Sequence, residues 1–177
     1  MNKHIKSPSR FAKNLLLGSC AALLSFSSLV NAADEGDSLP TFDLPSIHEG
    51  QANISSESLA GKTVFIDFWA SWCAPCLKSL PLYNELHHKY SDQGFEVVAI
   101  NVDNPIEDGL DWLLDTPLDF KIPSDPEGTS AELFEVIGMP TSYLVAPDGT
   151  IKLVHMGFRD GDLEIIEEEI QAVLAEQ

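Results

Sequence analysis

Residues 64–76 read VFIDFWASWCAPC, an apolar run that passes through a short turn into two cysteines. The run is rich in β-branched and aromatic side chains, which is typical of a strand buried on both of its faces. Beyond Cys76, residues 77–90 have the pattern of a helix. The stretch therefore predicts a central strand that delivers two thiols, Cys73 and Cys76, to the start of a helix.

The place of Cys73 at the mouth of that helix has a chemical consequence. The first turn of a helix carries free N–H groups, and the helix dipole favours negative charge there. A thiol in this position loses its proton more easily, and the thiolate is the nucleophile in reactions with disulfides. The predicted local geometry therefore favours dithiol–disulfide exchange.

The first 32 residues have the layout of a secretory signal peptide. Basic residues precede residue 14, residues 15–30 are apolar or small and uncharged, and Val30-Asn31-Ala32 supplies small side chains for cleavage. We therefore expect export, to the periplasm or an equivalent compartment, with a signal peptide over 1–32 and one domain over 33–177.

Two alternatives for the N-terminus stay open. The first is an uncleaved membrane anchor that leaves the domain facing the periplasm, although an apolar stretch of 16 residues is short for a span. The second is lipidation at Cys20, because Leu17-Gly18-Ser19-Cys20 resembles a lipoprotein cleavage site.

Cleavage after Ala32 leaves a strongly acidic chain. Six Lys or Arg residues then stand against 28 Asp or Glu, for a formal charge of −22. Such a charge repels nucleic acid and anionic lipid and favours a soluble monomer. The acidity is typical of a solvated surface. The alternative explanation is that the acidic surface binds a basic partner protein.

The cysteine count favours catalysis over stabilisation. Without Cys20, only Cys73 and Cys76 remain, and a disulfide between them closes a very small loop that restrains little of the unfolded chain. A structural zinc site needs two more ligands, and the histidines form no suitably spaced pair. We therefore expect no metal and no other cofactor.

The remaining periodicity predicts an α/β domain. Strands are expected at 63–69, 95–102, 142–146 and 150–155, helices at 74–90, 106–114 and 131–136 with a final helix capped by Asp162, and shorter pieces as a hairpin at 47–54 and a strand at 118–122. This order favours a mixed central β-sheet flanked by helices, with an N-terminal extension and a central βα insertion.

Residues 68–76 resemble the signature of the thioredoxin fold, and their flanks resemble the TlpA/ResA branch of exported thiol–disulfide oxidoreductases. The similarity runs from about residue 39 to the C-terminus. Besides the CxxC pair, the matching motifs occur in the same order as Phe42-Asp43-Leu44, Gly61-Lys62, Pro81, Asn101-Val102-Asp103, Gly138-Met139-Pro140-Thr141 and Pro147-Asp148-Gly149.

The resemblance implies a role for each matching residue. Cys73 would be the exposed attacking thiol, and Cys76 the buried thiol that releases the mixed disulfide. Pro140 would follow a cis peptide bond and leave the Met139 backbone free to pair with a substrate strand; an ordinary trans proline is the alternative. The substrate-binding surface would comprise Trp72, Ala74, Pro75, Met139 and Thr141.

Asp67 is an acid in the middle of an apolar strand, where burial should raise the pKa of its carboxyl. The resemblance implies that it accepts the proton of Cys76; a hydrogen-bonded carboxylate at a strand end is the alternative. Two family features are absent. Ser79 stands where some ResA-like proteins have Glu, and Ala99 where thioredoxin has Lys.

These observations lead to one functional hypothesis with two alternatives. We expect an exported enzyme that reduces disulfides of periplasmic proteins, apocytochrome c among the candidates, with electrons from a membrane thiol-electron donor. The dipeptide Ala74-Pro75 lacks the histidine typical of strong oxidants, which favours a potential nearer that of thioredoxin, about −270 mV. The alternatives are an oxidase or isomerase of the same fold and a metallochaperone.

Overall fold

The computed structural model describes Met1 and residues 33–177, so the predicted signal peptide lies outside the described residues. Its central sheet has four strands in the order β4-β3-β5-β6. Strand β3 is parallel to β4 and antiparallel to β5, and β5 is antiparallel to β6. The strands are β3 (Thr63–Trp69), β4 (Phe95–Asn101), β5 (Thr141–Val145) and β6 (Ile151–Met156). The expected mixed sheet is confirmed.

Strand β3 lies inside the sheet, between β4 and β5, and all seven of its residues are buried. Phe65 and Trp69 point into one apolar cluster, whereas Ile66 and Phe68 point into the other. This alternation is what a strand between two covered faces requires. The bounds of β3 agree with those predicted from its apolar run.

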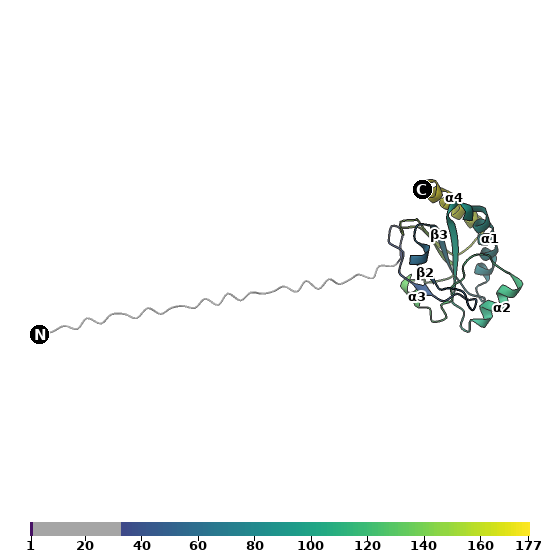
Figure 1. Cartoon of the computed structure of the whole chain (residues 1–177), viewed down its shortest axis with the longest axis horizontal. Coiled ribbons are helices and arrows are strands. Elements are labelled where there is room, and N and C mark those ends of the chain that lie inside the picture. The colour runs from purple at the N-terminus through teal and green to yellow at the C-terminus, as the bar shows by residue number, and fades with distance from the viewer. Residues whose placement is uncertain (2–32) are drawn as a thin grey trace. The chain divides into compact units, whose positions relative to one another are not determined.

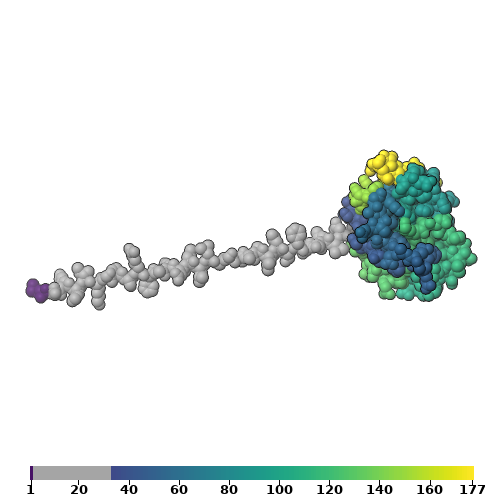
Figure 2. All heavy atoms as spheres, viewed as in Figure 1, coloured from purple at the N-terminus to yellow at the C-terminus, as the bar shows by residue number. Residues whose placement is uncertain are grey.

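The two faces of the sheet are covered by different segments (Figure 1). One face packs against three helices, α1 (Ala74–Tyr90), α2 (Glu107–Asp115) and α4 (Asp162–Ala175). The other face packs against β1 (Asp43–Leu44), β2 (Ile54–Ser55), η1 (Glu57–Leu59) and α3 (Thr129–Leu133). The helical turn η2 (Ser91–Gln93) connects α1 to β4. Figure 2 shows the segment that contains β1 and β2, in blue, on the face turned toward the viewer.

Two of the shorter predicted strands are wrong. The hairpin pairs Leu44 of β1 with Ile54 of β2, while Ile47 bonds to Ile122 instead of forming part of it. Residues 118–122 make one isolated bridge, between Lys121 and Val98, and no continuous strand. Pro123 has no N–H to donate, so a regular ladder cannot continue through it.

Two helix starts also differ from prediction. Helix α3 begins at Thr129, two residues before the predicted start, because the Asp125 carboxylate accepts hydrogen bonds from the N–H groups of Thr129 and Ser130 at 3.0 and 2.8 Å. Asp162, predicted as the cap of the last helix, is its first residue, and Gly161 is the cap with φ 94°. That left-handed conformation suits glycine.

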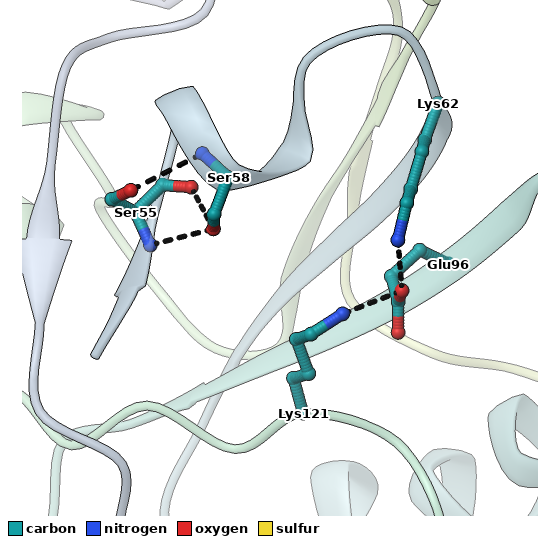
Figure 3. Close-up of polar contacts among 5 residues, drawn as sticks. All are labelled: Ser55, Ser58, Lys62, Glu96 and Lys121. Atoms are coloured by element: carbon teal, nitrogen blue, oxygen red, sulfur yellow. Dashed lines mark hydrogen bonds and ion pairs between the residues drawn. The ribbon is translucent and has the colours of Figure 1, made fainter. Parts of the chain in front are cut away.

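A half-buried glutamate joins three segments at the edge of the sheet (Figure 3). Glu96 of β4 accepts from Lys62 at 2.9 Å and from Lys121 at 2.6 Å. Nearby, the hydroxyl of Ser58 accepts from the N–H of Ser55, and that of Ser55 from the N–H of Ser58, which closes the η1 turn. Burial would raise the pKa of Glu96, but the two ammonium groups outweigh it and hold the pKa below its ordinary value.

Replacing Glu96 by Gln should destabilise the fold in a pH-dependent way. Because the folded pKa is depressed, the ion pairs stabilise above the unfolded pKa of 4.5, and the contribution is lost as pH falls. We expect Glu96→Gln to lower the free energy of unfolding by roughly 1 kcal/mol at pH 7, with the difference vanishing in acid. Urea denaturation at several pH values measures it, with the exposed Glu85→Gln as the control. A loss of equal size at pH 7 and in acid would contradict the role of the ion pairs.

Candidate active site

The junction between β3 and α1 holds the two cysteines at the start of a helix. Cys73 is the N-cap of α1, and its Sγ accepts a hydrogen bond from the N–H of Cys76 at 3.3 Å. The two residues are joined by a disulfide, with their Cα atoms 5.3 Å apart. Pro75 lies in the first turn, where its missing N–H removes no helical hydrogen bond. The expected position of the thiol pair is therefore the observed one.

The two sulfur-bearing residues differ little in exposure. Cys76 is fully buried, with its Sγ 4.0 Å from the carbonyl oxygen of Phe68, and only 5% of Cys73 is exposed. The expectation of an exposed Cys73 is therefore wrong for this disulfide-bonded state, because its side chain lies in the same buried cluster as Trp69. Trp72, the residue before Cys73, is 68% exposed.

A buried carboxylate fixes the loop that precedes Cys73. Both oxygens of Asp103 accept from the N–H of Ser71, at 3.1 and 2.9 Å, and one also accepts from the Ser71 hydroxyl at 2.9 Å. Asn101 donates to the same carboxylate at 2.7 Å. The Asn101-Val102-Asp103 motif at the end of β4 thus positions the turn that carries Trp72 and Cys73.

The second loop of the site contains Pro140. The Met139–Pro140 peptide bond is cis. Strand register pairs Thr141 with Phe68, so Pro140 lies beside the end of β3 where the turn to Cys73 begins. The Pro140 carbonyl accepts from Gly157, whereas the Met139 backbone makes no hydrogen bond with another described residue. That backbone is therefore available to an added strand.

A pocket of about 300 Å³ adjoins the Pro140 loop. Ile137 and Met156 on its wall are 88% and 57% exposed, and the Arg159 side chain also lines it. The hydroxyl of Thr141 is turned inward and donates to the Gly138 carbonyl at 2.7 Å, so this residue shapes the loop. The pocket thus presents apolar side chains and one cation beside Met139.

Asp67 lies inside the protein, on the face of β3 that α1 covers. The carboxylate is fully buried, and one oxygen accepts from the Ser142 hydroxyl at 2.6 Å while the other has no partner. Burial raises the pKa of Asp67 to about 8, although the hydrogen bond from Ser142 opposes the rise. Its partner on β4 is Ala99, which confirms that no lysine stands there.

The structure brings the predicted site residues into two groups. Cys73 and Cys76 lie at the start of α1 and Asp67 lies on the face of β3 that α1 covers, while Met139, Pro140 and Thr141 lie where the chain enters β5. Sequence reasoning missed Ser142, which bonds to Asp67, and the contact of Asp103 with Ser71. A polar residue inside the apolar run TSYLV was the available signal for Ser142.

The comparisons with known proteins agree with this geometry. The profile of the AhpC/TSA family matches residues 36–154. The chain is 32% identical over 166 residues to thiol-disulfide oxidoreductase ResA of Oceanobacillus iheyensis, which covers 88% of this chain and 86% of that protein. It is also 34% identical over 185 residues to thiol:disulfide interchange protein DsbE of Xylella fastidiosa. That alignment covers 96% of this chain and 91% of the relative.

A solved structure has the same fold. The crystal structure of a DsbE-type thiol:disulfide interchange protein of Chlorobium tepidum superposes with a TM-score of 0.77 at 40% identity, covering 81% of this chain and 99% of that one. A thioredoxin fold with a CxxC pair at a helix start defines a thiol-disulfide oxidoreductase. The chain belongs to the AhpC/TSA family, and it is a thiol-disulfide oxidoreductase of the ResA/DsbE type.

Replacing Asp67 by Asn should stabilise the oxidised protein. Between pH 4 and 8 the folded state binds a proton on Asp67 that the unfolded state, with a pKa of 3.8, has released. The free energy of unfolding therefore falls as pH rises through this window. We expect the free energy of unfolding of Asp67→Asn at pH 7 to exceed that of wild type by on the order of 4 kcal/mol.

Chemical denaturation between pH 3 and 9 measures this difference, which should shrink steadily as pH falls from 8 to 4 and vanish below about pH 4. Asp43→Asn, at an exposed position of β1, is the control and should leave the profile unchanged. A stability gain that does not vary with pH would mean that Asp67 is ionised in the folded protein.

Proposed function

We propose that this enzyme is exported and reduces disulfide bonds in proteins of the periplasm through Cys73 and Cys76. The observation that carries the proposal is the position of the Cys73 sulfur at the amide-lined start of α1, with Cys76 buried one helical turn further on. The layout of the first 32 residues supports export. In the part of the chain that the structure describes, no helix is long and apolar enough to cross a membrane.

The first chemical step is attack by the Cys73 thiolate on a substrate disulfide. The N–H of Cys76 points at this sulfur, and the dipole of α1 favours its negative charge. Thiolate attack forms a mixed disulfide between Cys73 and one substrate sulfur, and the other substrate sulfur leaves as a thiolate. The place of Cys73 at the N-cap of α1 makes it the attacking residue, because free N–H groups at a helix start stabilise a thiolate.

The second step is performed by Cys76. In the molecules whose Asp67 is ionised, a minority at pH 7 because its pKa is about 8, the Cys76 thiol gives a proton to this carboxylate, and the resulting thiolate attacks the sulfur of Cys73. The Cys73–Cys76 bond forms, the bond to the substrate breaks, and two electrons have passed to the substrate. A carboxyl with a pKa of about 8 is suited to this exchange, because a thiol has a similar pKa of about 8.5.

The substrate segment binds across the Pro140 loop. The unpaired backbone of Met139 accepts an extended strand, and the exposed Trp72 with Ala74 and Pro75 contacts the substrate from the start of α1. Main-chain pairing gives affinity without demanding one sequence, which suits an enzyme acting on several proteins. Apocytochrome c is the candidate substrate that the TlpA/ResA resemblance implies.

A reductase outside the cytoplasm needs a supply of electrons. After each turnover the Cys73–Cys76 disulfide must be reduced, and a membrane protein that carries electrons on thiols is the donor we propose. The short Ala74-Pro75 dipeptide has no group that strongly stabilises the reduced thiolate, which favours a reducing potential. The enzyme acts as a monomer in this scheme, and its acidic surface keeps it soluble.

Redox titration tests the direction of electron flow. We expect the Cys73–Cys76 pair to have a midpoint nearer the thioredoxin value of about −270 mV than the DsbA value of about −120 mV. Equilibration with glutathione or dithiothreitol buffers, read from tryptophan fluorescence, gives the potential. A midpoint above roughly −180 mV would reject the reductase in favour of an oxidase or isomerase.

Trapping in intact cells tests the substrates and the donor. Cys76→Ser blocks the second step, so mixed disulfides on Cys73 should accumulate and disappear on treatment with reductant. The matched control is the double variant with Cys73→Ser added, which should trap nothing. Adducts that are equally abundant in the double variant would remove Cys73 from its proposed role.

A further inference from the structure

Polar residues form a row across the sheet beside the buried acid. Strand register pairs Asp67 of β3 with Ser142 of β5, and Ser142 with His155 of β6. Residues paired across neighbouring strands point to the same face of a sheet. This face lies under α1 and α4, in an otherwise apolar cluster. The row therefore runs sideways from the active site toward the start of α4.

Three polar atoms along this row are buried and lack a hydrogen-bond partner. They are Oδ2 of Asp67, the hydroxyl of Tyr83 and Nε2 of His155. The last lies 3.1 Å from Oδ2 of Asp162, close enough for an ion pair but without hydrogen-bond geometry. Unsatisfied buried polar groups are rare in native proteins, and each calls for an explanation. Their gathering on one face points to a shared role.

Tyr83 lies within electrostatic reach of both ends of the row, because the charges of Asp67 and Asp162 both raise the pKa of its hydroxyl. It projects from α1 with its ring edge against Phe65 and Phe158. Burial raises the pKa of its hydroxyl, the charge of Asp67 raises that pKa further, and the nearby Ser142 and Ser79 hydroxyls oppose the rise. A hydroxyl that stays protonated can both donate and accept a hydrogen bond, which is what a proton relay needs.

The outer end of the row reaches the surface. The side chains of His155 and Asp162 are 15% and 13% exposed. Burial would raise the pKa of Asp162, but the N–H of Arg159, the side chain of His155 and the charge of Arg159 hold it below its ordinary value. Asp162 is therefore an ionised acceptor at neutral pH, in contact with solvent.

We propose that Ser142, Tyr83 and His155 form the route by which the proton taken up by Asp67 leaves for solvent. The inference rests on the proposed function, in which Cys76 gives its proton to Asp67. The protonated carboxyl donates to the Ser142 hydroxyl, whose own proton passes to Tyr83, and so outward to His155 and Asp162. Asp67 is then ionised again for the next turnover, and no electrons move along this path.

The charged groups around the route come from each element packed on it. Helix α1 contributes Tyr83 beside the uncharged Ser79, β6 contributes His155, and α4 with its preceding loop contributes Asp162 and Arg159. Strand β4 contributes no titratable group beside Asp67, because its partner there is Ala99. Each of these groups other than Asp67 lies away from Cys73, so variants at them leave the first step intact.

Rapid-mixing kinetics on the full enzyme test the route. Reduced protein is mixed with a model peptide disulfide between pH 5 and 9, and formation and resolution of the mixed disulfide are followed separately. Tyr83→Phe and His155→Gln should slow resolution about tenfold or more and leave formation unchanged. Ser142→Ala removes a donor to Asp67 and should also shift the pH profile of resolution upward by roughly one unit.

Matched variants separate a proton route from packing. Tyr143→Phe removes a buried hydroxyl from the same strand as Ser142, but from the opposite face, where it bonds to Phe134, and should change neither step. Ser142→Thr keeps the hydroxyl and should restore the wild-type pH profile. His155 is partly exposed, so His155→Gln gives a readout even if a core variant fails to fold.

The outcomes distinguish the two proposals. If wild type forms no mixed disulfide, the proposed function fails and the route falls with it. If wild type forms and resolves the mixed disulfide, and the Ser142, Tyr83 and His155 variants resolve it at the wild-type rate with the wild-type pH profile, the route alone is overturned. Equal slowing by Tyr143→Phe would assign the effect to packing and would also overturn it.

Discussion

The hydrogen bond from the N–H of Cys76 to the sulfur of Cys73 is the contact on which the rest of the structure depends. It places a sulfur atom where the first turn of α1 offers unpaired N–H groups and the positive end of its dipole. The chain must leave β3 and enter α1 within a few residues to achieve this. Burial of β3 on both faces fixes one side of that turn, and the carboxylate of Asp103, bonded to Ser71, fixes the other.

The buried acid Asp67 of β3 represents a compromise between stability and chemistry. A carboxyl whose pKa is raised from 3.8 to about 8 destabilises the folded state at neutral pH. The surrounding core tolerates this because Phe65, Trp69 and the residues of α1 around them are well packed. In return the protein holds a proton acceptor whose pKa is close to that of a thiol. The Ser142 hydroxyl donates a hydrogen bond to one oxygen of that acceptor, and the other oxygen has no partner.

Sequence alone predicted β3 and α1 with their observed bounds, because a run apolar on both faces and a helical pattern after CxxC are local signals. It also placed the cysteines and Asp67. It did not predict the contacts of Ser142 with Asp67 or of Asp103 with Ser71, since each depends on register between segments far apart in the chain. The low exposure of Cys73 likewise follows from tertiary packing. At residues 118–122, Pro123 interrupted a pattern that otherwise favours a strand.

The central claim is that the start of α1 lowers the pKa of the Cys73 thiol. The most direct test is the rate at which iodoacetamide alkylates each thiol of the reduced protein as a function of pH, with each cysteine identified by mass spectrometry. We expect Cys73 to react faster than Cys76 and to titrate well below the free-cysteine value of about 8.5. A Cys73 that titrates like free cysteine and reacts no faster than Cys76 would contradict it.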